Sequence, residues 1–261
     1  VLAVTPSTNG SFLASPVDDV GRLAKGADGR WAFTGLAARL PASLKPLGYV
    51  WSIVEHDGDL FFTTNRQIVR LTGGDPAKIQ TWPGSTAARL YRFHGQLYAF
   101  DAGAGLRRYA NGDFLPFAVG PELRDEKLRV VFEAVDRGLW CVQTDGAVFR
   151  VGDDGRTTAW PHDAASVIGD AAVRAGAALP DGGIVLCTGS RGVVVIGGDG
   201  HVRYHLDESN GLESNVVGTA LRDREGGVWV THTAGTSRLD LDPRVTVFDR
   251  TTGFGRTTNL L

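Results

Sequence analysis

The stretch that decides the fold begins with Asn210-Gly211-Leu212-Glu213-Ser214-Asn215, close to the C-terminus. An apolar run over residues 216–221 follows, and the turn Asp223-Arg224-Glu225-Gly226-Gly227 leads into Val228-Trp229-Val230. A further segment, Thr236-Ser237-Arg238-Leu239-Asp240, completes the unit. Short apolar runs separated by turns rich in Gly and Asp are typical of short antiparallel strands. The stretch therefore predicts three strands joined by tight turns.

The same order of turn and strand recurs five more times along the chain. We use the last residue of each turn-and-strand group as an anchor that marks the second strand of its unit. The anchors are Leu13, Phe61, Tyr98, Trp140, Val185 and Trp229. They are separated by 48, 37, 42, 45 and 44 residues, a period near 43. Self-similarity at such a period is the sequence signature of a repeat architecture.

A third and a fourth strand complete each unit. An Arg followed by an apolar residue or Tyr lies nine or ten residues past the anchor in five of the six units. These arginines are Arg22, Arg70, Arg108, Arg150 and Arg238, and the remaining unit carries Val195-Ile196 there. Fourth strands are expected after the next turn, at Trp31 and over residues 79–82, 114–117, 157–160, 202–206 and 245–248.

Four short antiparallel strands per repeat are the geometry of a propeller blade, whose sheet buries both faces only when neighbours stack around an axis. We therefore expect an all-β fold, a single β-propeller domain over residues 1–261 with six four-stranded blades. The segment 252–261 resembles the connector and first strand of another unit. Two alternatives stay open: a ring that closes with six blades, or a fragment of a longer array, with seven blades in the intact parent. A β-sandwich would not require fixed internal spacing.

Composition excludes several functional classes. The 27 Lys and Arg nearly balance 29 Asp and Glu, giving a net charge of -2, so we expect neither a nucleic-acid partner nor an anionic membrane surface. The longest apolar runs, such as residues 192–196, are far shorter than a membrane span, so direct membrane insertion is not expected. The chain begins at Val1 and contains no Met, which suggests a mature or excised fragment.

The two cysteines lie in apolar, strand-like runs. Cys141 and Cys187 are interpreted as buried small hydrophobic residues, with a bridge between them as the alternative. Trp140 and Trp229 are expected to pack between blades. The repeated arginines are expected to serve the scaffold, by pairing across strands or by packing their stems between blades.

The sixth unit closely resembles the two-component regulator propeller repeat. The resemblance rests on Asn210-Gly211-Leu212-x-Ser214-Asn215, on Asp223-x-x-Gly226-Gly227-Val228-Trp229-Val230 and on Gly235-x-Ser237-Arg238-Leu239-Asp240. The other five units keep only parts of this pattern. The resemblance implies a periplasmic or otherwise extracytoplasmic sensor domain of a bacterial receptor. It also implies a kinase or cyclase output domain in the parent chain and, in several relatives, a response to carbohydrates.

Motifs for enzyme chemistry are absent from the sequence. It contains no His-Glu-x-x-His, no Gly-x-Ser-x-Gly, no Gly-x-x-x-x-Gly-Lys and no Cys-x-x-Cys, so we expect no catalysis, no metal and no cofactor. Two alternatives remain. One is a lyase resembling the streptogramin-inactivating family, which would use a metal with His and Asp at the channel mouth. The other is a scaffold that binds another protein or forms a homodimer.

The candidate site follows from blade topology. The connections between second and third strands lie on the same face as the connections between blades, around the mouth of the central channel. Their polar residues differ from unit to unit while the scaffold repeats, as recognition of a small molecule or an oligosaccharide would require. The predicted ligand-binding residues on this rim are Asn65, Arg66, Asp101, Gln143, Asp145, Arg191, His232 and Thr233.

Overall fold

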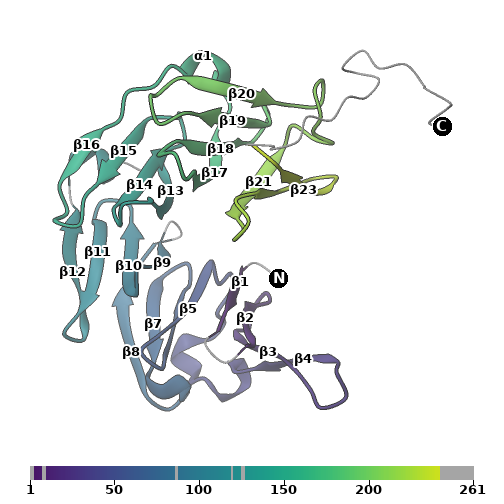
Figure 1. Cartoon of the computed structure of the whole chain (residues 1–261). Helices are drawn as coiled ribbons and strands as arrows, with labels where there is room; N and C mark the ends of the chain where they lie inside the picture. The colour runs from purple at the N-terminus through teal and green to yellow at the C-terminus, as the bar shows by residue number, and fades with distance from the viewer. Residues whose placement is uncertain (1–2, 8–9, 86–87, 119, 125–126, 242–261) are drawn as a thin grey trace, which may run out of the picture.

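The computed structural model describes residues 3–7, 10–85, 88–118, 120–124 and 127–241. Its strands form six antiparallel sheets, each made of strands consecutive in sequence, which succeed one another around a common centre (Figure 1). Blades 1 and 2 contain β1 (Ala3–Pro6), β2 (Phe12–Ser15), β3 (Gly21–Lys25), β4 (Trp31–Gly35), then β5 (Ser52–His56), β6 (Asp59–Thr63), β7 (Gln67–Leu71), β8 (Ile79–Pro83).

The later blades follow the same plan. Blades 3 and 4 contain β9 (Arg89–Phe93), β10 (Gln96–Asp101), β11 (Gly105–Ala110), β12 (Asp113–Ala118), then β13 (Leu128–Glu133), β14 (Leu139–Gln143), β15 (Val148–Val151), β16 (Thr157–Ala159). Blades 5 and 6 contain β17 (Val173–Ala178), β18 (Ile184–Thr188), β19 (Val193–Ile196), β20 (Val202–Leu206), then β21 (Val217–Arg222), β22 (Val228–His232), β23 (Gly235–Leu239). The short helices are η1 (Ala37–Arg39), η2 (Ala42–Leu44), η3 (Thr72–Gly74), η4 (Pro121–Leu123) and α1 (Ala165–Ile168).

These sheets confirm the six-bladed β-propeller. The first strand of each blade lies innermost and the fourth strand, where described, lies outermost (Figure 1). In the sixth blade three strands fall within the described residues, and the expected strand at 245–248 and the segment 252–261 lie outside them.

The register explains why the anchor and the arginine repeat together. In every blade the anchor on the second strand pairs directly with the repeated position on the third, as in Phe61 opposite Arg70 and Trp140 opposite Arg150. The blade that lacks the arginine has the same register, with Val185 opposite Val195. The repeated pair is therefore a cross-strand neighbour pair, the unit by which sheets are stabilised.

Tight turns with positive φ join the first and second strands in blades 2 and 3. Asp57 and Gly58 have φ angles of 50° and 82°, and the equivalent His94 and Gly95 have 48° and 77°. Two consecutive residues with positive φ favour a type I′ hairpin, whose twist matches that of the flanking strands. This requirement explains the polar residue followed by Gly that recurs at these turns.

Five hydrophobic cores hold the blades together, one between each pair of successive blades. Trp140 of blade 4, for example, packs in the same core as Leu186 of blade 5 and is only 5% exposed. Among the described residues, no comparable core joins blade 6 to blade 1. Cys141 and Cys187 lie in these cores as free thiols, as predicted, and burial raises the pKa of each to about 12.

One expectation about the cores was wrong. Trp229 occupies the same repeat position as Trp140, yet it is 42% exposed, and Leu221 beside it is 70% exposed. Both residues lie on the face of blade 6 that points away from blade 5, because Val228 and Val230 on the opposite face fill the core with blade 5. Burial of the anchor is supplied by the next blade, and no described blade covers this face.

Candidate binding face at the channel mouth

The blade topology divides the disc into two faces. We call the side with the second-to-third-strand loops and the connections between blades the channel face, and the opposite side, with the turns between first and second and between third and fourth strands, the turn face. The predicted ligand-binding residues lie at the channel-face ends of second strands or in the loops that follow them. They are distributed over blades 2 to 6.

An aromatic cluster is the most distinctive feature of the channel face. Trp51 precedes β5, and its ring centroid lies 5.3 Å from that of Tyr49, which is 47% exposed. The indole Nε1 donates a hydrogen bond of 2.6 Å to Oδ1 of Asn65. The guanidinium carbon of Arg89, at the start of β9, lies 4.8 Å from the centroid of the Trp51 ring. The cluster thus joins blades 2 and 3.

These contacts hold Trp51 in one orientation while leaving it half-buried rather than covered. A cation over an indole face is attracted by the ring quadrupole, and the hydrogen bond to Asn65 satisfies the indole N–H. Rigid amphipathic rings provide contact area at a low cost in conformational entropy. The arrangement suits a ligand that offers a flat apolar face surrounded by hydroxyl groups.

The sequence pattern predicted Asn65 and its neighbour Arg66 but not Tyr49, Trp51 and Arg89. Arg66 is exposed beside Asn65, and no ion pair of its side chain occurs among the described residues. The missed residues lie in the connection before β5 and at the start of β9, rather than in the loops between second and third strands. The signal that could have found them is the pair of aromatic residues at the end of a connection between blades.

The side chains of two predicted residues are buried and form hydrogen bonds within the protein. Asp101 is 8% exposed and accepts a hydrogen bond of 2.5 Å from the Ser85 hydroxyl. Gln143 is 7% exposed, and its Nε2 donates to the carbonyl oxygen of Glu122 at 2.9 Å. Buried polar groups are satisfied in this way in most proteins. Each side chain fixes a channel-face loop to the preceding connection.

Three further predicted residues also have partners of their own. Lys127 Nζ lies 2.9 Å from Oδ2 of Asp145, and its hydrogen bond lowers the pKa of that carboxyl. Arg191 Nη2 lies 3.6 Å from Asp170 at the exposed edge of blade 5. The Thr233 hydroxyl lies 2.7 Å from that of Ser214.

His232 is half-buried at the end of β22. Its Nε2 lies 2.9 Å from the Ser237 hydroxyl, while its Nδ1 is buried without a hydrogen-bond partner in the described structure. No hydrogen bond joins the side chains of any two of the eight predicted residues within the part of the chain described. Their role in ligand binding stays a prediction.

The repeated arginines lie toward the turn face and have partners inside the scaffold, as expected. Arg70 Nε donates to Oδ2 of Asp59 at 2.6 Å, and Arg238 Nε donates to Oδ2 of Asp223 at 2.8 Å. Arg150 pairs with Asp136, and Arg108 lies 5.0 Å from the ring centroid of Phe117. The ion pairs of Arg70, Arg150 and Arg238 tie the third strand to the start of the second strand or to the turn before it, whereas Arg108 contacts the fourth strand.

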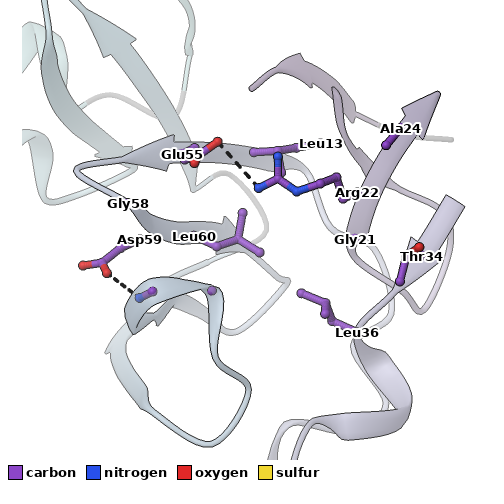
Figure 2. Close-up of a pocket in the computed structure, with 12 residues that line it drawn as sticks. Leu13, Gly21, Arg22, Ala24, Thr34, Leu36, Glu55, Gly58, Asp59 and Leu60 are labelled. Carbon is purple, nitrogen blue, oxygen red and sulfur yellow. Dashed lines mark hydrogen bonds and ion pairs between the residues drawn. The ribbon is translucent and has the colours of Figure 1, made fainter. Parts of the chain in front are cut away.

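The remaining repeated arginine connects two blades. Figure 2 shows Arg22 of blade 1 directed toward Glu55 of blade 2, with the charged atoms 3.8 Å apart, at a cavity of about 450 Å³. Leu13, Leu36 and Leu60 line the apolar side of this cavity. None of the eight predicted ligand-binding residues lines it. The cavity lies between blades 1 and 2.

Over the described residues, no group of three or more His, Cys, Asp or Glu side chains is placed to hold a metal ion. Likewise, no helix in the described part is long and apolar enough to cross a membrane.

Comparison with known proteins gives matches in structure only. No family model matches the sequence, and no curated protein matches it significantly. A streptogramin B lyase superposes with a TM-score of 0.70 at 18% identity, covering 92% of this chain and 78% of that one. The extracellular domain assigned to the hybrid two-component system BT4673 from B. thetaiotaomicron superposes with a TM-score of 0.68 at 15% identity, covering 93% of this chain.

The chain spans only 32% of the BT4673 structure, about a third of its length. A more distant match is the WD40 propeller domain of Doa1, with a TM-score of 0.54 at 14% identity and 90% coverage of both chains. Identities this low establish a shared fold. The expected resemblance to propellers of two-component systems is thus confirmed at the level of the fold: this chain is a β-propeller of the architecture found in their extracellular domains.

Proposed function

We propose that this chain is a non-catalytic, extracytoplasmic ligand-binding propeller of a bacterial signal-transduction receptor, and that it binds a saccharide on its channel face. A kinase or cyclase output domain in the parent chain would receive the signal. The observation that carries the proposal is the cluster of Tyr49, Trp51, Asn65 and Arg89. The structural likeness to extracellular domains of two-component systems supports the receptor role.

Each member of the cluster has a part in this proposal. The rings of Tyr49 and Trp51 would contact the apolar face of a sugar ring, while Arg66 would bind its hydroxyl groups. Asn65 and Arg89 hold the indole in place, so little ordering is required when the ligand binds. Binding would therefore depend on Trp51 more than on any single rim residue.

The test is a thermal-shift screen against mono- and oligosaccharides, followed by titration calorimetry on the compounds that stabilise the protein. A ligand that binds only the folded state raises its apparent stability. We expect Trp51→Ala to weaken binding about tenfold or more, corresponding to roughly 1.4 kcal/mol. Trp31→Ala is the matched control, because Trp31 is 50% exposed and lies on β4, away from the channel.

Two results would overturn the proposal. One is an absence of binding across the whole panel, and the other is equal loss of affinity in the Trp51 and Trp31 variants. The second result would show that the effect of Trp51→Ala is not specific to the channel face.

A further inference from the structure

Three innermost strands, those of blades 4, 5 and 6, carry an extra residue at the same place. The pairing of β13 with β14 shifts register between Leu128 and Val130, that of β17 with β18 between Val173 and Ala175, and that of β21 with β22 between Val217 and Thr219. The extra residue is Gly218 in blade 6, but it is an arginine in blades 4 and 5, Arg129 and Arg174. A bulge of this kind bends the strand and redirects a side chain, and bulges are frequent next to functional sites.

The bulged arginines occupy the position that Trp51 occupies in blade 2. Each of the three residues lies three positions before the residue that pairs with the anchor of its blade. The pairing residue is Val54 for Trp51, Phe132 for Arg129 and Ala177 for Arg174. The repeat therefore places Arg129, Arg174 and Trp51 at equivalent points near the channel mouth. Because equivalent positions lie at equivalent depth in a propeller, the three side chains lie at the same level around one channel mouth.

Burial indicates the direction of the two side chains. Arg129 and Arg174 are exposed, whereas their neighbours Leu128 and Val173 are almost fully buried in cores between blades. Both faces of an innermost strand in blades 4 and 5 are covered by adjacent blades, so solvent reaches it from the channel. The guanidinium of Arg174 also lies against Gly189, where an added Cβ would meet Nε at 2.8 Å. Gly189 belongs to a channel-face loop.

A third cation extends this charge toward the aromatic cluster. Arg89 lies over Trp51, and its pKa is lowered, first by burial and also by the positive charge of Arg129. The two guanidinium groups therefore share one region of the channel mouth across blades 3 and 4. Like charges held near one another create a field that favours an anion.

The two bulged arginines have no acidic partner among the described residues. No ion pair or side-chain hydrogen bond of Arg129 or Arg174 occurs among the described residues, although Arg70, Arg150 and Arg238 on the turn face all have acidic partners. The whole chain carries a net charge of -2, so a general excess of basic residues does not account for unpaired arginines here.

We propose that the ligand of the channel face is an acidic saccharide, whose carboxylate or sulfate group binds Arg129 and Arg174 while a sugar ring contacts Trp51. This inference rests on the proposed function and specifies its ligand class. A planar guanidinium binds a carboxylate or sulfate through two parallel hydrogen bonds, which gives both affinity and orientation. Uronic acids and sugar sulfates present such a group on a ring that can stack on an indole.

The test compares matched ligands by titration calorimetry. Oligogalacturonate, oligomannuronate and oligoglucuronate are each paired with their carboxyl-reduced, neutral forms, and sulfated oligosaccharides are paired with their desulfated forms. We expect at least one acidic member to bind about tenfold or more tightly than its neutral counterpart, because hydrogen bonds between charged groups are the stronger ones. The preference should weaken as salt increases. The ligand pair that shows this preference identifies the acidic group as a carboxylate or a sulfate.

A pair of double variants assigns the effect to the two arginines. Arg129→Gln with Arg174→Gln should lower the affinity for the acidic form to that for the neutral form, so that the preference is lost. Arg137→Gln with Arg224→Gln is the matched control: it removes the same charge from exposed turn-face residues and should retain the full preference. Circular dichroism melts confirm that all variants are folded.

The outcomes separate this inference from the proposed function. If neutral saccharides bind through Trp51 as tightly as acidic ones, the proposed function stands and the acidic ligand is wrong. If an acidic preference persists in the Arg129 and Arg174 double variant, the assignment to these residues is wrong. If no saccharide of either kind binds, both proposals fail.

Discussion

On the turn face, Arg70 and Arg238 donate to carboxylates within their own blades, whereas at the channel mouth Arg129 and Arg174 have no such partner among the described residues. The same residue type thus serves two purposes in one scaffold. Arginines that recur at a fixed place in the repeat hold turns to strands. Arginines that the repeat does not require are left to interact with something outside the chain.

The strongest test of this comparison is to remove a paired arginine. Arg70 lies over Phe61 and Tyr109 and binds Asp59, which is only 9% exposed. Arg70→Ala would leave the carboxylate without its cation, and we expect a loss of roughly 2–3 kcal/mol in the free energy of unfolding. Urea denaturation measures it.

Arg156→Ala provides the control for that experiment. Arg156 also pairs with an aspartate, Asp154, but its side chain is 88% exposed. Exposed pairs contribute little, so a loss below about 0.5 kcal/mol is expected. Equal losses in the two variants would contradict the role assigned to the repeated arginine.

Lowering the pH should reduce the stability that the pair of Asp223 and Arg238 contributes on the turn face of blade 6. The hydrogen bond from Arg238 is the largest cause that lowers the pKa of Asp223, from 3.8 to about 2. A lowered pKa in the folded state contributes stability that is present above about pH 4 and is lost as the pH falls toward 2. The melting temperature of the protein should therefore exceed that of Asp223→Asn by a constant amount above pH 5.

The difference in melting temperature should then shrink as the pH falls from 4 to 2. A difference that stays constant down to pH 2 would show that the charge of Asp223 contributes nothing. Titration of the Asp223 carboxyl by NMR provides an independent check of the same pKa.

The smallest effect is expected at the channel mouth. Arg129→Gln and Arg174→Gln remove exposed cations without described partners, so each should change the free energy of unfolding by less than about 0.5 kcal/mol. Urea denaturation again provides the measurement. A loss comparable to that of Arg70→Ala would mean that these arginines belong to the scaffold after all.

The two faces also differ in how much of them the sequence predicts. The arginines opposite Phe61 and Trp140 were found because their position repeats, and the register shows that the repetition reflects a cross-strand pair. Trp229 shows the limit of this reasoning. Its position repeats as well, but its burial depends on an adjacent blade rather than on its own unit.

The candidate site was only partly predictable. Asn65 lies in a loop that the repeat identifies, and it accepts a hydrogen bond from Trp51. Trp51, Arg129 and Arg174 were missed because they lie at the start of the innermost strand of their blades, outside the loops between second and third strands that the repeat identifies as the rim. The bulges that expose the two arginines are shifts in strand pairing, which the residue types alone do not reveal.

The central claim is that a saccharide binds at the channel mouth beside Trp51. Hydrogen–deuterium exchange, measured with and without the tightest saccharide at saturation, tests this claim across the whole molecule. We predict slower exchange in residues 47–52, 64–67 and 88–91, and no change in the turn-face residues 56–59 and 111–113. Protection confined to the turn face would contradict the claim, and so would the absence of protection around Trp51.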